Sequence, residues 1–388
     1  MIRKTGKYFI AVFVLTELVL RIIRPSGLDF YRKQKQIHRF DETYFIDLEE
    51  NAKEHIRHFL GHYEMNFSTN ERGFRATATI DRNKKQIGCI GDSVVMGFGV
   101  NDEETFCYML NGDYNSSSFQ AVNMGVDAYG PAAIAEKLKR HIPGLNLKLL
   151  YYFPTAGDDI DNEMYYKRKH NALDYYLFKI QFLLTKYSYA MLGLKITQEQ
   201  IKYRVLETFL FPLEKMQRTI SCSKQTNSRQ CQDVYSWSWN SFFADFTLPQ
   251  QAPANQAPVF ADNECSEQLQ PYPVSKQMMA DIESIVNISR SGNIKLVFVL
   301  APTDIETAWC SQRGNSHRFF SYLETLEKYL IEKKLPYINL NQYTRQMQDE
   351  NGRLNPRPYY IIGDGHYTSL GNKWVAKILK EKASGYLK

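Results

Sequence analysis

The sequence of 388 residues lacks the patterns that identify several common classes of protein. It contains no Gly-Lys-Ser or Gly-Lys-Thr phosphate loop, and Gly97-Phe98-Gly99 is not followed by the third glycine of a dinucleotide-binding turn. No CxxC pair and no cluster of cysteine and histidine indicates a metal site. Basic residues are scattered and the net charge is only +6, without the basic stripe of a nucleic-acid-binding protein. We therefore expect no cofactor, no metal and no nucleic-acid partner.

Long hydrophobic runs are also scarce, and Tyr8 to Ile23 is the one candidate for a membrane segment. It is short of the roughly 20 residues that a span needs. It also carries Glu17 and Arg21, which are four residues apart and can pair on one face of a helix. No small-residue cleavage site follows, which favours an uncleaved anchor in residues 1–25 over a removable signal peptide. The alternative is an amphipathic helix packed on the domain.

Cysteine is sparse, with six residues in the whole chain. Cys89 and Cys107 lie in apolar surroundings, which predicts buried thiols. The other cysteines lie in polar or loop-like surroundings: Cys222, Cys231, Cys265 and Cys310. Such cysteines indicate disulfides and an oxidising compartment, although the sequence does not give their pairing. With the anchor, this predicts a single-pass membrane protein whose soluble domain is periplasmic or otherwise extracytoplasmic. Basic residues on both sides of the segment leave its orientation open.

Apolar runs alternate with amphipathic segments over most of the remaining chain. The predicted strands are residues 87–90, 118–123, 147–153, 294–300 and 337–340, and the predicted helices are residues 104–111, 131–141, 319–333 and 370–380. Strands separated by helices indicate a mostly parallel sheet covered on both faces, which is a three-layer α/β/α sandwich. In such a sheet the chemistry lies at the carboxyl ends of the strands.

The chain divides into four parts on this basis. Residues 1–25 are the anchor, and residues 26–79 are a mixed lead-in. Residues 80–162 and 286–388 form the α/β domain. Residues 163–285 interrupt the alternation and are interpreted as an inserted cap, with a helical, aromatic first half and a polar second half. We expect the aromatic residues of the first half to form the core of the cap.

The tripeptide Gly91-Asp92-Ser93 ends a predicted strand and opens into a helix. A serine at such a turn is held clear of the sheet, near helix amides that favour an anion, and it becomes a nucleophile once a base is supplied. The candidate base is His366, which follows Asp364 by two residues. Each residue also has a structural interpretation, because Gly-Asp-Ser is a common turn sequence and His366 fits a surface loop.

These blocks together resemble the SGNH hydrolase superfamily, the GDSL-type esterases and acyltransferases. The resemblance runs from about Asn70 to the C-terminus, apart from the insert, and it is greatest with membrane-anchored members that carry the lead-in pattern of residues 70–75. It implies a flavodoxin-like sandwich and a catalytic triad of Ser93, Asp364 and His366. The main-chain amides of Ser93 and Gly125 would bind the oxyanion.

The third block departs from this pattern at Asp158, where the superfamily usually has an asparagine that donates to the oxyanion. An ionised aspartate only accepts hydrogen bonds and would repel the developing negative charge. Loss of one such donor costs roughly 2.7–4 kcal/mol in the barrier. Protonation of Asp158 would restore a donor, and entry of Asn162 into the site is a further alternative.

The sequence thus supports two hypotheses. The first is a serine-dependent ester hydrolase or O-acyltransferase that acts through an acyl-Ser93 intermediate. Its substrate, as the resemblance and the anchor imply, would be a carbohydrate or lipid ester of the cell envelope. The second is a catalytically weak or inactive member of the same fold, tethered to the membrane as a binding or assembly subunit that meets a protein partner through the cap.

Overall fold

A five-stranded parallel sheet lies at the centre of the protein, in the strand order β11-β9-β7-β5-β6. The computed structural model describes residues 2–59, 61–112, 119–209, 265–266, 272–302, 304–317, 320–361, 365–383 and 385–386. The strands are β5 (Lys85–Gly91), β6 (Phe119–Asn123), β7 (Leu147–Phe153), β9 (Lys295–Leu300) and β11 (Tyr337–Asn339). All five predicted strands are therefore present, and the expected α/β class is confirmed.

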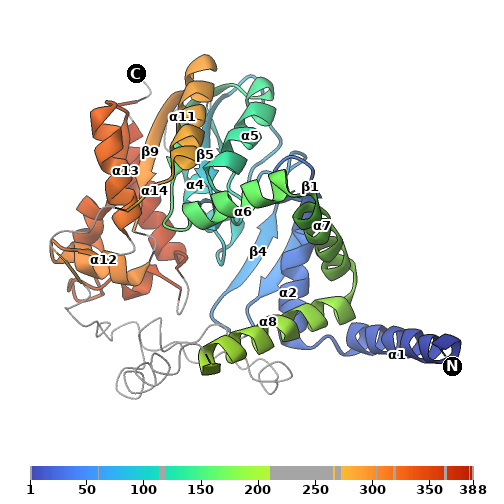
Figure 1. Cartoon of the computed structure of the whole chain (residues 1–388). Coiled ribbons are helices and arrows are strands. Elements are labelled where there is room, and N and C mark those ends of the chain that lie inside the picture. Colours follow the sequence, from blue (N-terminus) through green and yellow to red (C-terminus); the bar gives the residue numbers. More distant parts are fainter. Residues whose placement is uncertain are drawn as a thin grey trace.

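Helices cover both faces of the sheet (Figure 1). One face is covered by α5 (Pro131–His141), α11 (Lys276–Ser291) and α13 (Ser321–Glu332). The other is covered by α4 (Phe106–Met109), α12 (Ile305–Gln312) and α14 (Ser369–Ala383). Side chains of one strand alternate between the two layers, because Phe298 packs in the first layer and Val297 and Val299 pack in the second. This alternation gives the three-layer sandwich.

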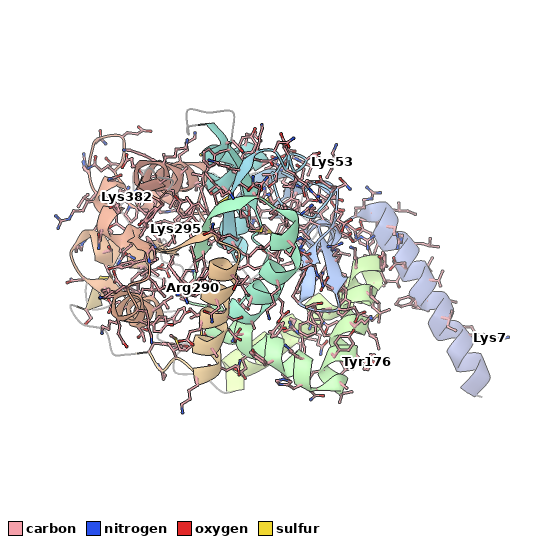
Figure 2. The ribbon with its side chains drawn as sticks, turned by 90° about the horizontal axis from the view of Figure 1, so that it is seen from above. Lys7, Lys53, Tyr176, Arg290, Lys295 and Lys382 are labelled. Carbon is pink, nitrogen blue, oxygen red and sulfur yellow. A yellow bond between two sulfur atoms is a disulfide. The ribbon has the colours of Figure 1, made fainter. Side chains whose placement is uncertain are left out.

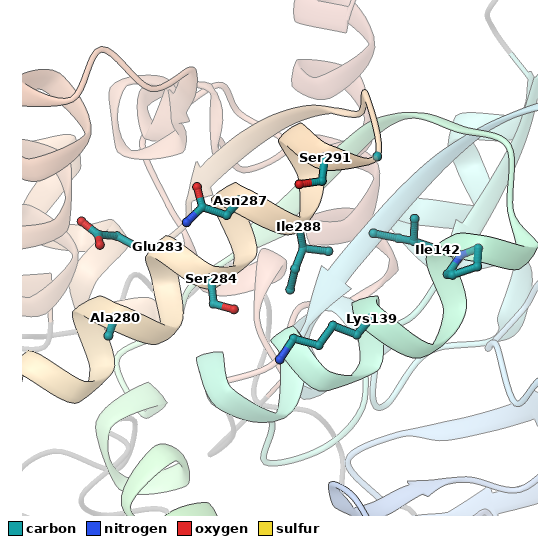
Figure 3. Close-up of a pocket in the computed structure, with 10 residues that line it drawn as sticks. Lys139, Ile142, Ala280, Glu283, Ser284, Asn287, Ile288 and Ser291 are labelled. Carbon is teal, nitrogen blue, oxygen red and sulfur yellow. The ribbon is translucent and has the colours of Figure 1, made fainter.

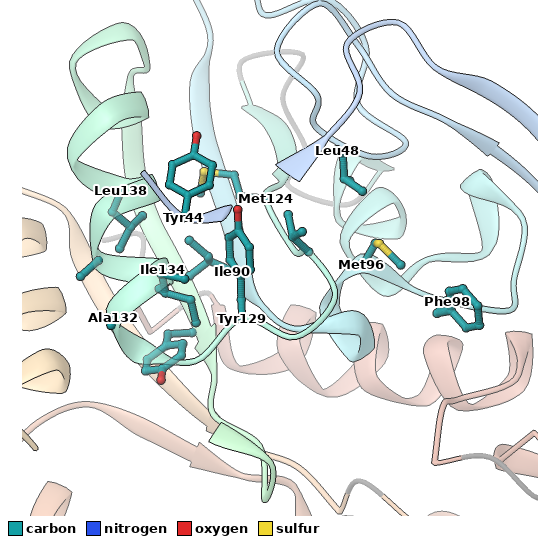
Figure 4. Packing of buried hydrophobic residues seen from close by; sticks show 14 of the residues in the cluster. Tyr44, Leu48, Ile90, Met96, Phe98, Met124, Tyr129, Ala132, Ile134 and Leu138 are labelled. Atoms are coloured by element: carbon teal, nitrogen blue, oxygen red, sulfur yellow. The ribbon is translucent and has the colours of Figure 1, made fainter. Parts of the chain in front are cut away.

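The lead-in, residues 26–79, packs against the layer that contains α5, α11 and α13. It comprises α2 (Ser26–Gln36), the hairpin β1 (His38–Asp41) with β2 (Phe45–Leu48), and the hairpin β3 (Lys53–Arg57) with β4 (Glu64–Ser68). Tyr44 and Leu48 from this segment pack in one cluster with Ile90, Met124 and residues of α5 (Figure 4). Residues 26–79 therefore share the core of the α/β domain.

The first half of the predicted cap is helical, as expected. It forms α6 (Asp158–His170), α7 (Ala172–Tyr187) and α8 (Tyr189–Phe209). Phe178 and Phe182 of α7 contact the ring of Phe40, whereas Tyr176 and Ile180 are exposed. Phe178 and Phe182 thus pack against the lead-in and do not form a separate core of the cap, and the side of α7 with Tyr176 is uncovered among the described residues. Most of the polar second half, including Cys222 and Cys231, lies outside the described residues, and α11 begins at Lys276, within the range assigned to the cap.

Helix α1 (Ile2–Ile23) projects from the body of the protein, with Lys7 near its far end (Figure 2). Within the described residues, no helix combines the length and apolarity needed to cross a membrane. The predicted membrane span in residues 1–25 is therefore not supported. The pairing of Glu17 with Arg21 is confirmed, at 2.7 Å. The same Glu17 carboxylate accepts hydrogen bonds from the main-chain N–H groups of Tyr189 and Ala190, so α1 docks on the first turn of α8.

Two local predictions are wrong. Cys89 and Cys107 are not thiols but form a disulfide, because β5 and α4 bring their Cα atoms to 6.2 Å. The apolar surroundings were correctly read as burial, but they carry no information on pairing. The predicted helix over residues 104–111 is broken, because Thr105 is extended and its side chain caps α4 by accepting from the Tyr108 N–H. Cys265 and Cys310 form a disulfide, as their polar surroundings indicated.

Candidate active site

Ser93 is the first residue of a short helix, α3 (Ser93–Met96), directly after β5. Asp92 caps this helix, since its Oδ1 accepts from the Val94 N–H at 2.9 Å. The helix ends after one turn at Gly97, whose φ of +77° suits glycine. As the first helical residue, Ser93 has an N–H without an acceptor inside the helix. The predicted strand, turn and helix around Ser93 are therefore present.

His366 meets Ser93 at this edge of the sheet. Its Nε2 lies 2.7 Å from Ser93 Oγ, although the two residues are 273 positions apart in the sequence. Both side chains are partly exposed, and the ring of Phe98 packs against the imidazole with a centroid distance of 5.2 Å. The predicted meeting of hydroxyl and imidazole is thus found. Asp364, the predicted orienting carboxylate, lies outside the described residues.

Gly125 lies where the segment after β6 passes close to α3. A Cβ atom at this position would be 2.3 Å from the Met96 nitrogen, so only glycine allows the approach. The Gly125 N–H donates to Asn123 Oδ1 at 3.0 Å, and Asn123 Nδ2 donates to the Val95 carbonyl at 2.9 Å. Asn123 thereby ties the two segments together. The Gly125 amide, which was expected to bind the oxyanion, already has an acceptor in this structure.

Asp158 points into the protein and is only 1% exposed. Its Oδ2 accepts from the hydroxyl groups of Tyr152 and Tyr322, at 3.4 and 3.2 Å. Its Oδ1 lies 3.2 Å from the hydroxyl of Thr155. Burial raises the pKa of Asp158 well above its usual value, and the negative charge of Asp92 raises it further. Asn162 is also buried and bonds to the Ala132 N–H and to Asp281, away from Ser93.

Arg75 supports the turn that follows Ser93, a role that the sequence analysis did not assign. Its guanidinium donates to the carbonyl oxygens of Met96, Gly97 and Val100 and pairs with Asp102 at 3.2 Å. It is fully buried. The lead-in pattern explains its placement, since Asn70 Oδ1 accepts from the Arg72 and Phe74 N–H groups and shapes the turn before it. An arginine at the end of a turn motif was the available signal.

Further carboxylates surround this edge. Burial, chiefly, and the charge of Asp92 raise the pKa of Asp161 to about 7. Asp127, in the segment after β6, pairs with His38 at 3.0 Å. Among the described residues, no group of histidine, cysteine, aspartate and glutamate is arranged to hold a metal ion. The site therefore presents a hydroxyl and an imidazole in a setting rich in carboxyl groups.

A groove on the protein surface lies away from this site. It has a volume of about 610 Å³ and is an open groove between α5 and α11 (Figure 3). Lys139 and Ile142 line one side, and Glu283, Ser284 and Asn287 line the other. Neither Ser93 nor His366 borders it. The contact of Ser93 with His366 and this groove are thus separate features of this structure.

The sequence matches no known family profile and no curated protein. Twelve chains of solved structures are similar to this chain, among them the following three. A candidate acylhydrolase from Bacteroides fragilis is 12% identical, covers 80% of this chain and 92% of its own, and has a TM-score of 0.36. A GDSL-like lipase from Bacteroides thetaiotaomicron is 10% identical, with 80% and 93% covered and a TM-score of 0.35. A candidate lipolytic protein of the G-D-S-L family from Desulfitobacterium hafniense is 10% identical, with 76% and 99% covered and a TM-score of 0.34.

Because these TM-scores are all below 0.5, the fold is judged from the chain's own strands and helices. Its own parallel sheet has the expected order of strands and helices, and Ser93 and His366 meet at the carboxyl edge of that sheet. The resemblance to the SGNH hydrolases that the sequence blocks carry is thus confirmed at the level of the fold.

Proposed function

We propose that the protein is a serine-dependent ester hydrolase or O-acyltransferase. The contact of 2.7 Å between Ser93 Oγ and His366 Nε2 is the observation that carries this proposal. It joins a nucleophile to a base within hydrogen-bonding reach, as nucleophilic catalysis requires. The partial exposure of both residues leaves them open to a substrate.

In the proposed reaction Ser93 Oγ attacks the ester carbonyl carbon while His366 Nε2 takes the hydroxyl proton. The tetrahedral intermediate then expels the alcohol, which receives that proton from His366, and an acyl-Ser93 ester remains. Water, or the hydroxyl group of an acceptor sugar, attacks this ester with His366 again as base. In this proposal the Ser93 N–H donates to the oxyanion, and Asp364 stays the predicted partner of the imidazole.

The proposed substrate is a carbohydrate or lipid ester of the cell envelope. This part of the proposal is supported by the resemblance and by the compartment that the cysteines indicate. The disulfides Cys89–Cys107 and Cys265–Cys310 suit an oxidising, extracytoplasmic location.

A non-catalytic binding or assembly subunit is the second candidate. Two of the three groups expected to bind the oxyanion favour this candidate. The Gly125 N–H is bonded to Asn123, and Asp158 faces three hydroxyl groups in the interior of the protein. Of the expected donors, the Ser93 N–H then remains, because it is the first N–H of α3 and has no acceptor inside that helix. A protein of this kind would bind an ester without turning it over.

Labelling by a fluorophosphonate probe separates the two candidates. We expect covalent labelling of the wild type and hydrolysis of p-nitrophenyl acetate, both abolished by Ser93→Ala. The matched control is Ser284→Ala, which changes a serine in the groove between α5 and α11. It should behave as the wild type. A folded wild type that neither labels nor turns over the ester would favour the binding subunit.

A further inference from the structure

Thr155 lies between two carboxyl groups next to the Ser93 turn. Its Oγ1 is 3.0 Å from Asp92 Oδ2 and 3.2 Å from Asp158 Oδ1. A hydroxyl group has one proton, so it donates to only one of these oxygens. The second contact is a hydrogen bond only when the other carboxyl group donates a proton to Thr155 Oγ1. One of the two aspartates is therefore protonated if both contacts are hydrogen bonds.

Asp158 is the better place for that proton. It is 1% exposed, and its second oxygen is surrounded by the hydroxyl groups of Tyr152 and Tyr322, which are themselves buried. Burial raises the pKa of Asp92 too, but the Val94 N–H and the nearby His366 oppose that rise. The negative charge is thus better placed on Asp92, and the neutral acid on Asp158.

The other groups around Asp158 agree with this assignment. Tyr152 from β7, Tyr322 from α13 and Asp161 from its own helix face it, and Asp92 faces it from the turn after β5. None of these four groups is a cation. His366 lowers the pKa of Asp92 and is not among the groups that shift the pKa of Asp158. An ionised Asp158 would therefore meet negative charge and hydroxyl groups, without a positive partner among these groups.

We propose that Asp158 is a positioning residue, which through Thr155 holds Asp92 and so holds the turn that presents Ser93. The chain of hydrogen bonds runs from the Asp158 acid to Thr155 Oγ1, and from the Thr155 hydroxyl to Asp92 Oδ2. Asp92 Oδ1 then accepts from the Val94 N–H. An asparagine at position 158 would donate to Thr155 in the same way, which explains why aspartic acid stands where the resemblance expects an amide. The proposal rests on the proposed role of Ser93.

Three variants test this chain by the kinetics of p-nitrophenyl acetate hydrolysis. Asp158→Asn keeps the donor, so kcat should stay within about threefold of the wild type. Thr155→Val removes the link, so kcat should fall by about 10- to 100-fold with little change in KM, because a nucleophile is misplaced while binding is kept. Thr155→Ser keeps a hydroxyl and should restore most of the rate.

The matched control is Thr185→Val, because Thr185 is also buried but bonds only to main-chain oxygens of α7. It should leave the kinetics unchanged, and thermal unfolding shows whether each variant folds. A rise of kcat by about tenfold or more in Asp158→Asn would overturn the proposal, because it would place a charged Asp158 at the oxyanion. Wild-type kinetics in Thr155→Val would overturn it as well.

Two measurements do not depend on turnover and so separate this proposal from the proposed function. At pH 7 the infrared difference spectrum of wild type minus Asp158→Asn should contain the carbonyl band of a protonated carboxyl group. Hydrogen exchange of residues 91–97 should be at least about fivefold faster in Thr155→Val, because the cap of α3 loosens. These two measurements test the inference even if the wild type does not hydrolyse the ester. A carboxylate band for Asp158 would refute the inference, and so would unchanged hydrogen exchange of residues 91–97 in Thr155→Val.

Discussion

Arg75 Nη1 donates a hydrogen bond to the main-chain carbonyl oxygen of Gly97 at 2.6 Å. A residue of the lead-in thus holds the end of the helix that begins with Ser93. The same guanidinium bonds to the carbonyls of Met96 and Val100, so it serves several acceptors of the loop after α3 at once. The lead-in is therefore a structural part of the site and more than a connection.

Arg75→Met should strongly destabilise the protein. The change leaves three carbonyl oxygens without their donor and removes the positive partner of the partly exposed Asp102, and each buried acceptor left without a hydrogen bond costs about 1–3 kcal/mol. Urea unfolding measures this loss in the free energy of unfolding. Arg82→Met at an exposed position is the control and should stay within about 0.5 kcal/mol. A loss for Arg75→Met as small as that of the control would show that the guanidinium is not needed.

Glu17→Ala should release α1 from the body. The Glu17 carboxylate accepts from Ser188 Oγ and Ala190 N–H, each at 2.8 Å, and from Tyr189 N–H at 3.2 Å. Its loss leaves the Tyr189 and Ala190 N–H groups without this acceptor, although Ser188 Oγ still accepts from the Met191 N–H, and loss of a capping acceptor costs about 0.5–2 kcal/mol. Hydrogen exchange should become faster in α1 and in the first turn of α8. Glu332→Ala at an exposed position should leave the exchange of both segments as in the wild type, and equal exchange in the two variants would contradict the docking role.

Asp161→Asn should change how stability depends on pH. Burial, followed by the charge of Asp92, raises the pKa of Asp161 to about 7 in the folded protein, so between its unfolded pKa and about 7 the folded state binds the extra proton. This contribution to stability is fully present below the unfolded pKa and is lost as pH rises through about 7. The variant should therefore gain stability relative to the wild type between pH 5 and pH 8. Urea unfolding at both pH values checks this, and an equal difference at both would show an ordinary pKa.

The two described disulfides should differ in how readily they are reduced. Cys89 and Cys107 are both fully buried, whereas Cys265 is partly exposed. A thiolate must reach a sulfur atom to exchange with it, so access limits the rate. Under mild reductant in the folded state, Cys265–Cys310 should open first. Alkylation followed by mass spectrometry gives the order, and earlier alkylation of Cys89 would contradict it.

Several elements followed directly from local patterns. Residues 131–141 and 147–153 were predicted as a helix and a strand, and both have these bounds in the structure. An apolar run between turn residues and a proline at the first helical turn are local signals that neighbours rarely overrule. The serine turn after β5 was predictable for the same reason, since glycine, aspartate and serine specify such a turn over a few residues.

Other features depended on neighbours that are remote in sequence. Thr105 broke a predicted helix because its side chain caps α4, and the Cys89–Cys107 bond formed because β5 and α4 are packed together. Glu17 appeared as one half of a local ion pair, but its main partners are residues at the start of α8, more than 170 positions away in the case of Tyr189 and Ala190. Hydrophobic periodicity contains no information on such partners.

The sequence by itself determined the α/β alternation, the serine turn and the identity of the candidate base, because these arise from short-range propensity and ordered motifs. Only the tertiary structure decided that Ser93 and His366 meet, that the Gly125 amide bonds to Asn123, and that Asp158 is turned into the interior. The physical reason is that hydrogen-bond partners and burial are set by packing of segments far apart in the chain. A single residue type, such as the aspartate at position 158, therefore has a chemistry that its neighbours in space determine.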